Sequence, residues 1–185
     1  QKQKGLPTIQ GEIEDKLSAI LGEPIKTKGA SRTDAGVHAK EQVVNFFTDS
    51  PIPGERFPRI LNDHLPPTIR VIWAREAEDG RFHARFSAVS RTYKYFLLNR
   101  NQVYPFIARF ALIYPETLDL ELMKEAAKEL EGLHDFVGFT SERGNTIRNL
   151  LKLDISKKQD IIIFRLEANA FLKGMARNLV GLLLQ

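Results

Sequence analysis

The sequence predicts an α+β protein whose sheet is largely antiparallel. Some segments carry apolar residues at helical spacing, whereas others alternate between apolar and polar residues with the period of a strand. The alternating segments are joined by hairpins and irregular loops, and the helical segments lie apart from them along the chain. The chain has 185 residues, 43% of them hydrophobic, so it is long enough to bury a core.

The first predicted helix covers residues 9–21. Thr8 is a suitable N-cap because its hydroxyl can accept a hydrogen bond from the first turn, and Gly22 closes the helix. The apolar residues that define its packing face are Ile9, Ile13, Leu17, Ile20 and Leu21. We therefore expect this segment to serve packing.

Three further helices are predicted. A short helix at residues 55–64 ends before Pro66 and Pro67, which cannot continue it. Residues 171–184 form the last helix. Between them, residues 118–133 form an amphipathic helix whose apolar face consists of Leu122, Ala126, Leu130 and Leu133.

The alternating segments predict three strands and one hairpin. The single strands are residues 42–48, 68–74 and 91–98, and the hairpin joins 151–156 to 161–167. In the second and third strands the alternation predicts one face made of Ile69, Val71 and Trp73, and one made of Tyr93, Tyr95 and Leu97.

Positive charge is concentrated in one part of the sequence. The net charge is +4, but residues 70–109 alone carry eight basic residues against three acidic ones. Seven of the eight are arginines, which suit bidentate contacts to phosphate, and aromatic residues are interleaved with them. A solvated basic face would explain the charge alone, whereas the aromatic residues favour a nucleic acid as partner.

Several classes of protein are disfavoured by composition. Cysteine is absent, which removes disulfides and cysteine-based zinc sites and favours a cytoplasmic protein. The longest apolar run, 179–184, is too short to cross a membrane, and we see no signal peptide. The four histidines are scattered singly, so we expect no metal site. Both ends look cut, and we expect the chain to lack both native termini.

Residues 31–39, Ser-Arg-Thr-Asp-Ala-Gly-Val-His-Ala, are the most informative stretch. Asp34 and Gly36 predict a tight turn, because Asp can bond the backbone two residues on and Gly tolerates conformations that other residues resist. A turn by itself needs neither Arg32 nor Thr33. The string resembles the active-site signature of the tRNA pseudouridine synthase A (TruA) family.

Three later stretches resemble the same family in the same order. Phe82-His83-Ala84-Arg85-Phe86 leads into Arg91-Thr92-Tyr93-Lys94-Tyr95, and His134–Phe139 and Asn169–Gly181 follow. Together they span nearly the whole chain. One departure is Lys173-Gly174, where relatives often carry histidines, and it affects the expected substrate contacts near Arg177.

The resemblance implies the pseudouridine synthase fold. This consists of two related α+β halves that share a largely antiparallel sheet flanked by helices, with the active-site cleft between them. The halves would be residues 1–90, with the Asp34 motif, and 91–185, with Tyr93 and Arg177. The resemblance also implies a homodimer, and a substrate uridine at positions 38 to 40 of the tRNA anticodon stem-loop.

The resemblance further implies three catalytic residues. Asp34 would be the nucleophile, attacking the base at C6 or assisting departure at C1′. Arg177 would pair with Asp34 within about 4 Å and keep it ionised and oriented, and its apolar neighbours Met175, Leu179 and Val180 predict partial burial. Tyr93, which pattern alone would place in the core, would stack on the base and help remove the C5 proton. The isomerisation needs no cofactor.

The same resemblance implies RNA contacts. A uridine inside a stem must be flipped out before it can react, and Arg32 would enter the space that it leaves. The residues expected to bind RNA are Arg32, His38, Arg81, His83, Arg85 and Arg91.

Two other functions remain open at this point. One is a non-catalytic RNA-binding or tRNA-folding module with the same fold, although such a module would not need Asp34, Tyr93 and Arg177 together. The other is an Asp-dependent glycosidase or nucleosidase, which normally uses two acids around one bond. No second acid lies in the motifs of Asp34 or Arg177.

Overall fold

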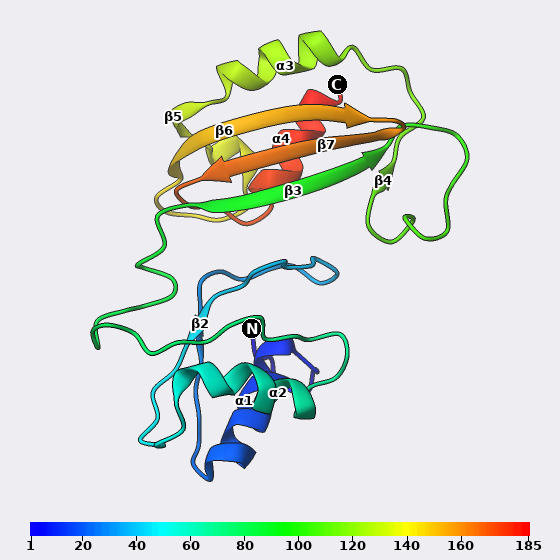
Figure 1. Ribbon diagram of the computed structural model, residues 1–185. Coiled ribbons are helices and arrows are strands. Elements are labelled where there is room, and N and C mark those ends of the chain that lie inside the picture. The colour runs from blue at the N-terminus through cyan, green and yellow to red at the C-terminus, as the bar shows by residue number, and fades with distance from the viewer. The chain divides into compact units, whose positions relative to one another are not determined.

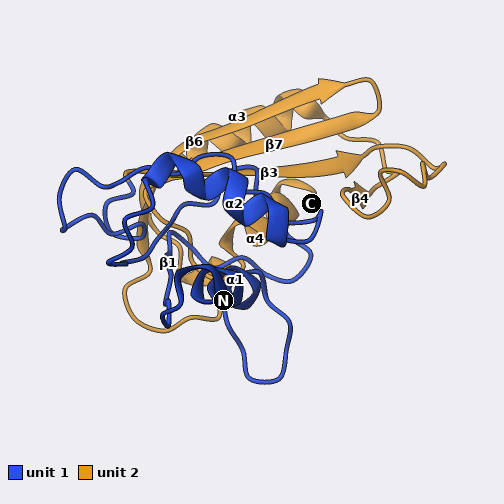
Figure 2. Cartoon of the chain, turned by 60° about the horizontal axis from the view of Figure 1, so that its bottom comes forward, with its two compact units in different colours: residues 1–88 blue, residues 89–185 orange.

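The computed structural model describes all 185 residues and has the predicted α+β architecture, with four α-helices and a five-stranded mixed sheet (Figure 1). The chain forms two compact units, residues 1–88 and 89–185 (Figure 2). No helix has both the length and the apolar character needed to cross a membrane.

Unit 1 is built on the helix α1, Ile9–Leu21. The predicted caps are confirmed: the Thr8 hydroxyl accepts a hydrogen bond from the Gly11 N–H, and Gly22 adopts a left-handed conformation with φ of 70°. α2 follows as Phe57–His64, after the 3-10 turn η1, Gly54–Arg56. The buried core between these helices consists of Leu17, Ile25, Phe57, Leu61 and Leu65.

A buried carboxylate joins α1 to the segment that follows it. Glu14 is only 7% exposed, and its Oε1 accepts hydrogen bonds from the Thr27 N–H at 2.9 Å, the Thr27 hydroxyl at 3.1 Å and the Gln10 amide at 2.9 Å. Burial by itself raises the pKa of Glu14, but these hydrogen bonds and the charge of Lys2 outweigh it and lower the pKa below its ordinary value.

The predicted strands of unit 1 are shorter than expected or absent. β1, Lys28–Gly29, pairs antiparallel with β2, Val44–Asn45, so only two residues of the predicted 42–48 strand are in a ladder. The strand predicted at 68–74 is wrong, because the backbone of Val71 bonds to a side chain instead. Its N–H donates to Asn62 Oδ1 and its carbonyl accepts from Asn62 Nδ2, both at 2.8 Å.

The predicted face of this segment is also wrong at one position. Ile69 and Val71 pack against the core as expected, but Trp73 is 54% exposed and Ala74 takes its place. Without a regular strand the strict alternation of side chains is lost, so the period of two fails after Val71.

Unit 2 contains the sheet, in the order β4-β3-β7-β6-β5. Every neighbouring pair is antiparallel except β3 and β4, so the sheet is largely antiparallel as predicted. The predicted hairpin is confirmed in β6 and β7. The strands are β3 (Arg91–Leu98), β4 (Leu112–Ile113), β5 (Gly132–Asp135), β6 (Ile147–Lys158) and β7 (Ile161–Ala168).

Two helices cover one face of this sheet, α3 (Leu120–Glu129) and α4 (Met175–Leu183) (Figure 1). Alternate residues of β7 supply the centre of the core, because a strand turns every second side chain to the same face. They are Ile162, Phe164, Leu166 and Ala168, each 0% exposed. The helices pack on them through Met123, Ala127, Met175, Leu179, Val180 and Leu183.

α3 is shorter than the predicted helix 118–133. Asp119 caps its start, and the chain leaves the helix at Leu130. Gly132, with φ of 106°, then begins strand β5, so Leu133 lies in a strand and is exposed. The buried face of α3 is Met123 and Ala127, whereas the predicted Leu122 is exposed.

Candidate active site

Asp34 lies in the long loop that joins β1 to β2 in unit 1. The predicted turn is confirmed: the Val37 N–H donates to the Asp34 carbonyl at 3.2 Å, and Gly36 has φ of 80°. Positive φ at the third position of a turn favours glycine because it has no Cβ. Asp34 is exposed, together with the neighbouring Arg32 and His38, so the loop presents a carboxylate beside basic side chains to solvent.

The base of this loop is held by hydrogen bonds. The Ala30 N–H donates to the Val43 carbonyl at 2.9 Å, next to the β1–β2 pair, and the Gln42 amide donates to the Ser31 carbonyl at 2.6 Å. The two arms of the loop are therefore fixed on either side of the Asp34 turn.

A second predicted segment reaches the same hairpin. Asn45, in β2, accepts a hydrogen bond from the Ala84 N–H at 2.9 Å, and Ala84 is buried. This contact joins residues 39 positions apart and places the Phe82–Arg85 segment beside the hairpin that carries Asp34. Sequence reasoning missed Asn45. The feature of the sequence that could have indicated a role for Asn45 is an amide side chain in the middle of an apolar run, Val43-Val44-Asn45-Phe46-Phe47.

His83 organises this segment locally. Its carbonyl accepts from the N–H groups of Phe86 at 3.0 Å and Ser87 at 2.8 Å, and its Nδ1 accepts from the Arg85 N–H at 3.1 Å. The Arg85 guanidinium lies 5.7 Å from the centre of the Phe86 ring. Phe86 is 76% exposed, so unit 1 carries an aromatic surface with a cation on it, as many RNA-binding sites do.

Arg81, also predicted to bind RNA, has a partner within unit 1. Its Nε and one terminal nitrogen donate to Asp79 Oδ2 at 3.1 and 3.0 Å. The arginine side chain is nevertheless 91% exposed. A pair this exposed is worth little in water, so it does not stop Arg81 from contacting a phosphate.

Tyr93 lies on β3 in unit 2. It is part of the predicted face with Tyr95 and Leu97, opposite Leu166 of β7, but it is only partly buried. The Phe171 ring meets it edge to face, with centres 4.8 Å apart and planes at 85°. Phe171 therefore limits the orientations that the tyrosine ring can take, and sequence reasoning gave it no such role.

Arg177 lies in the first turn of α4, and one expectation about it is wrong. Met175, Leu179 and Val180 are buried as predicted, but Arg177 is exposed. Arg177 is two residues after Met175, which is about 200° around the helix at 3.6 residues per turn. Its side chain therefore starts from the opposite face and needs no acidic partner to offset burial.

The guanidinium of Arg177 folds back toward the start of the helix. A Cβ built on Gly174, the residue before α4, would be 3.8 Å from an Arg177 terminal nitrogen. Gly174 has φ of 78°, so it also provides the left-handed conformation that begins the helix. A side chain at Gly174, in the Lys173-Gly174 departure, would therefore begin in contact with the side chains of Arg177 and Asn178.

Two side chains hold the start of α4 to the loop after β5. The Asn178 amide donates to the Phe139 carbonyl at 2.8 Å, and the Thr140 hydroxyl donates to the Lys173 carbonyl at 3.0 Å. Near the sheet, Arg91, predicted to bind RNA, donates to the Asn169 carbonyl at 2.7 Å. The His134–Phe139 and Asn169–Gly181 stretches are therefore neighbours in unit 2.

The structure thus groups the predicted residues within each unit. Asp34 and the Phe82–Arg85 segment share unit 1, and Tyr93 and Arg177 share unit 2. The Asp34–Arg177 ion pair, which would join residues of the two units, stays a prediction. No group of three or more His, Asp or Glu side chains is placed to hold a metal ion.

The family model for tRNA pseudouridine synthase matches residues 1–87 and 126–185 of this chain. The chain belongs to the tRNA pseudouridine synthase family. It is 42% identical to tRNA pseudouridine synthase A of Thermoanaerobacter pseudethanolicus over 186 residues, which cover 99% of this chain and 76% of that protein.

Other relatives agree with this assignment. The tRNA pseudouridine synthase A of Methylacidiphilum infernorum is 41% identical to this chain. The match covers all of this chain and 74% of that enzyme. The one from Aeromonas hydrophila is 39% identical, with 69% of its length covered. Both the resemblance and the enzyme class predicted from it, an isomerase, are therefore confirmed.

Proposed function

We propose that this protein converts uridine to pseudouridine at positions 38 to 40 of the tRNA anticodon stem-loop, with Asp34 as the nucleophile. The observation that carries the proposal is the exposed Asp34 on its hydrogen-bonded turn, within the part of the chain that the family model matches. A large substrate can reach an exposed carboxylate, whereas it could not reach a buried carboxylate.

The reaction rearranges bonds without net loss or gain of atoms. The N1–C1′ bond of the uridine breaks while Asp34 adds to C6 of the base or to C1′ of the ribose. The base turns over, C5 bonds to C1′, and the carboxylate leaves. The proton on C5 is removed and N1 ends with a proton, so neither an oxidant nor a group donor is consumed.

Tyr93 and Arg177 have separate roles in this proposal. Tyr93 stacks on the base and helps to remove the C5 proton, and its contact with Phe171 supports a fixed ring orientation. Arg177 is an exposed cation at the start of α4 and pairs with the Asp34 carboxylate. That pairing keeps the nucleophile ionised.

The substrate uridine must leave its stem before reacting, at a cost of a few kcal/mol of unstacking. Arg32, exposed two residues before Asp34, fills the space that the base vacates. Arg85, lying on the exposed Phe86 ring, supplies a contact to the RNA. The expected homodimer and cytoplasmic location stay predictions.

The test compares Asp34→Asn with the wild type, measuring tritium release from C5-labelled uridine in tRNA and, separately, tRNA affinity. We expect no turnover and almost unchanged affinity, because affinity comes from many basic contacts. Asp49→Asn, which changes another exposed aspartate of unit 1, is the control and should keep wild-type turnover.

Two results would contradict the proposal. Asp34→Asn turnover within about tenfold of wild type, a barrier change of only about 1.4 kcal/mol, would exclude Asp34 as the nucleophile. A full-length wild-type protein that binds tRNA but forms no pseudouridine would favour a non-catalytic RNA-binding module.

A further inference from the structure

One end of the unit 2 sheet carries an exposed aromatic and basic surface that the proposed chemistry does not use. It consists of loop 99–111, between β3 and β4, and the adjoining end of the β6–β7 hairpin, residues 157–160, which are the last two residues of β6 and the turn. Leu98 at this end is five residues from Tyr93 along β3, about 17 Å at the rise of a strand. The surface is therefore well separated from Tyr93.

The loop is held in place although its side chains are exposed. The Tyr104 carbonyl accepts from the N–H groups of Ile107 and Ala108 at 2.9 and 3.0 Å, and the Ile107 carbonyl accepts from Phe110 at 2.8 Å. At its base Arg100 donates to Asp160 at 2.9 Å and lies 4.3 Å from the Tyr104 ring centre. The loop is thus bound to the β6–β7 turn.

This framework leaves apolar side chains in solvent. Phe106, at the tip, is 89% exposed, and Phe110 is 56% exposed. Large aromatic side chains this exposed indicate a surface that another molecule covers.

The charges of this surface indicate which molecule. Four basic residues, Arg100, Arg109, Lys157 and Lys158, stand against one acid, Asp160, which Arg100 already pairs. Arg109, Lys157 and Lys158 are exposed. Aromatic rings beside exposed cations suit a single-stranded nucleic acid, because bases stack on the rings and phosphates contact the cations.

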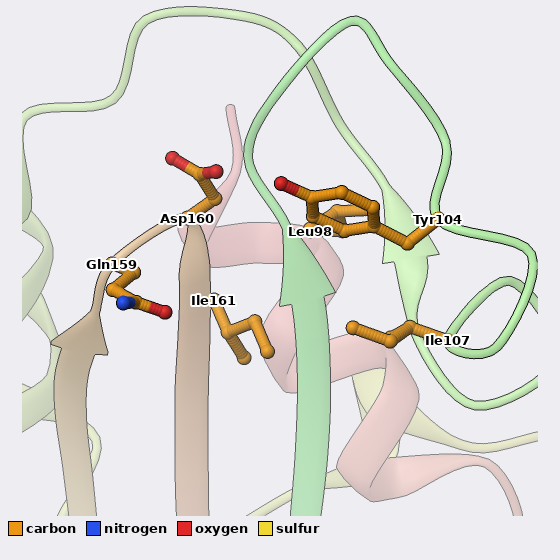
Figure 3. A pocket seen from close by; sticks show the side chains of 6 residues that line it. All are labelled: Leu98, Tyr104, Ile107, Gln159, Asp160 and Ile161. Atoms are coloured by element: carbon orange, nitrogen blue, oxygen red, sulfur yellow. The ribbon is translucent and has the colours of Figure 1, made fainter.

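A pocket of about 350 Å³ lies between the loop and the turn (Figure 3). Leu98, Ile107 and Ile161 give it an apolar lining, and Figure 3 shows the Tyr104 hydroxyl pointing toward the Asp160 carboxylate at the other side. Gln159, which also lines it, is the one non-glycine residue of the chain with positive φ, at 54°. Positive φ is the usual conformation in a two-residue hairpin turn such as Gln159-Asp160.

We propose that this surface is a second tRNA contact, which binds an unpaired nucleotide of the substrate outside the reacting uridine. Phe106 stacks on a base, and Arg109, Lys157 and Lys158 contact the adjoining phosphates. The pocket takes a base against the Tyr104 ring, with the Gln159 amide beside its edge. The inference rests on the proposed action on tRNA.

The test measures the affinity of unmodified tRNA, and KM for pseudouridine formation, in Phe106→Ala and Phe106→Leu. Alanine should weaken binding about tenfold, because stacking is lost. Leucine should weaken it nearly as much, since it keeps apolar volume without an aromatic face. Leu122→Ala, which removes another exposed apolar side chain of unit 2, is the control and should bind as wild type.

A second pair of measurements separates RNA from protein as the partner. Lys157→Ala with Lys158→Ala should lower the slope of log affinity against log salt by about one to two. Sedimentation should give the same oligomeric state for every variant. A changed oligomeric state in Phe106→Ala would overturn the proposal and identify a second copy of the chain as the partner.

The failures of the two proposals are distinguishable. A wild-type protein that forms no pseudouridine contradicts the proposed function, whatever the loop variants do. A wild type that forms it, with Phe106→Ala at wild-type affinity and KM, overturns the second contact alone. Wild-type affinity in Phe106→Leu would likewise overturn stacking.

Discussion

Asn45 Oδ1 accepts a hydrogen bond from the Ala84 N–H at 2.9 Å, so one amide holds the Phe82–Arg85 segment against the hairpin that carries Asp34. Ala84 is 3% exposed, which means that water does not easily replace this bond. The contact gives two separate motifs of the sequence one common support in unit 1.

We expect Asn45→Ala to loosen this support. A buried N–H left without an acceptor costs about 1–3 kcal/mol, so amide exchange of residues 82–88 should become faster. Asn45→Asp, which keeps an oxygen in the same place, is the control and should protect the Ala84 amide better than alanine does. Equal exchange in wild type and Asn45→Ala would show that the bond adds nothing.

Tyr93→Phe should reduce turnover by at least about tenfold while tRNA affinity stays close to wild type. The change removes only the hydroxyl that the proposal assigns to proton transfer, and it keeps the edge-to-face packing on Phe171. Tyr95→Phe is the matched control, because it removes the same hydroxyl from a residue that is on the same face of β3 and packs on the core. If both variants turn over like the wild type in a tritium-release assay, Tyr93 has no role in proton transfer.

Arg177→Met should lower turnover without lowering the stability of unit 2, because Arg177 is exposed and lies away from the buried face of α4. Thermal unfolding and single-turnover rates measure the two effects. Lys128→Met removes another exposed cation of unit 2 and should keep turnover. A similar loss in both variants would mean that general positive charge matters, and not a pair with Asp34.

Replacing Arg81 and Arg85 together by alanine should flatten the dependence of tRNA affinity on salt. Each phosphate contact releases about one counterion, so the slope of log affinity against log salt should fall by about one to two. Arg59→Ala, in an exposed position on α2, is the control and should leave the slope unchanged. An unchanged slope in the double variant would place the RNA elsewhere.

Protonation of the Glu14 carboxylate in acid should make unit 1 less stable. Its folded-state pKa lies below the ordinary value of 4.5, because hydrogen bonds from Thr27 and Gln10 outweigh the effect of burial. The stabilisation is therefore complete above the unfolded pKa and is lost as pH falls through the lower folded value. Hydrogen exchange of α1 between pH 6 and about pH 3 measures it. In Glu14→Gln the increase in hydrogen exchange of α1 at low pH should be smaller than in the wild type. The same increase in both proteins would mean that other carboxylates cause the loss of stability in acid.

Local sequence determined the elements whose stabilising contacts are themselves local. Thr8 and Gly22 marked α1, because a cap and a left-handed closure depend on a few adjacent residues. The Asp34 turn was predictable for the same reason. The hairpin of β6 and β7 was predictable as two apolar segments around a polar turn, because its turn and its pairing lie close together in the sequence.

Only the tertiary structure decided the conformation and burial of residues whose partners lie outside their own helix, strand or loop. The strand predicted at 68–74 is absent because Asn62, on helix α2 nine residues before Val71, bonds both backbone groups of Val71. Leu122 is exposed because the side of α3 that meets the sheet carries Met123. Ala84 is held by Asn45, and Tyr93 by Phe171, across 39 and 78 residues. Periodicity reports which residues can be buried, but the partner that buries or bonds them is set by the packed chain.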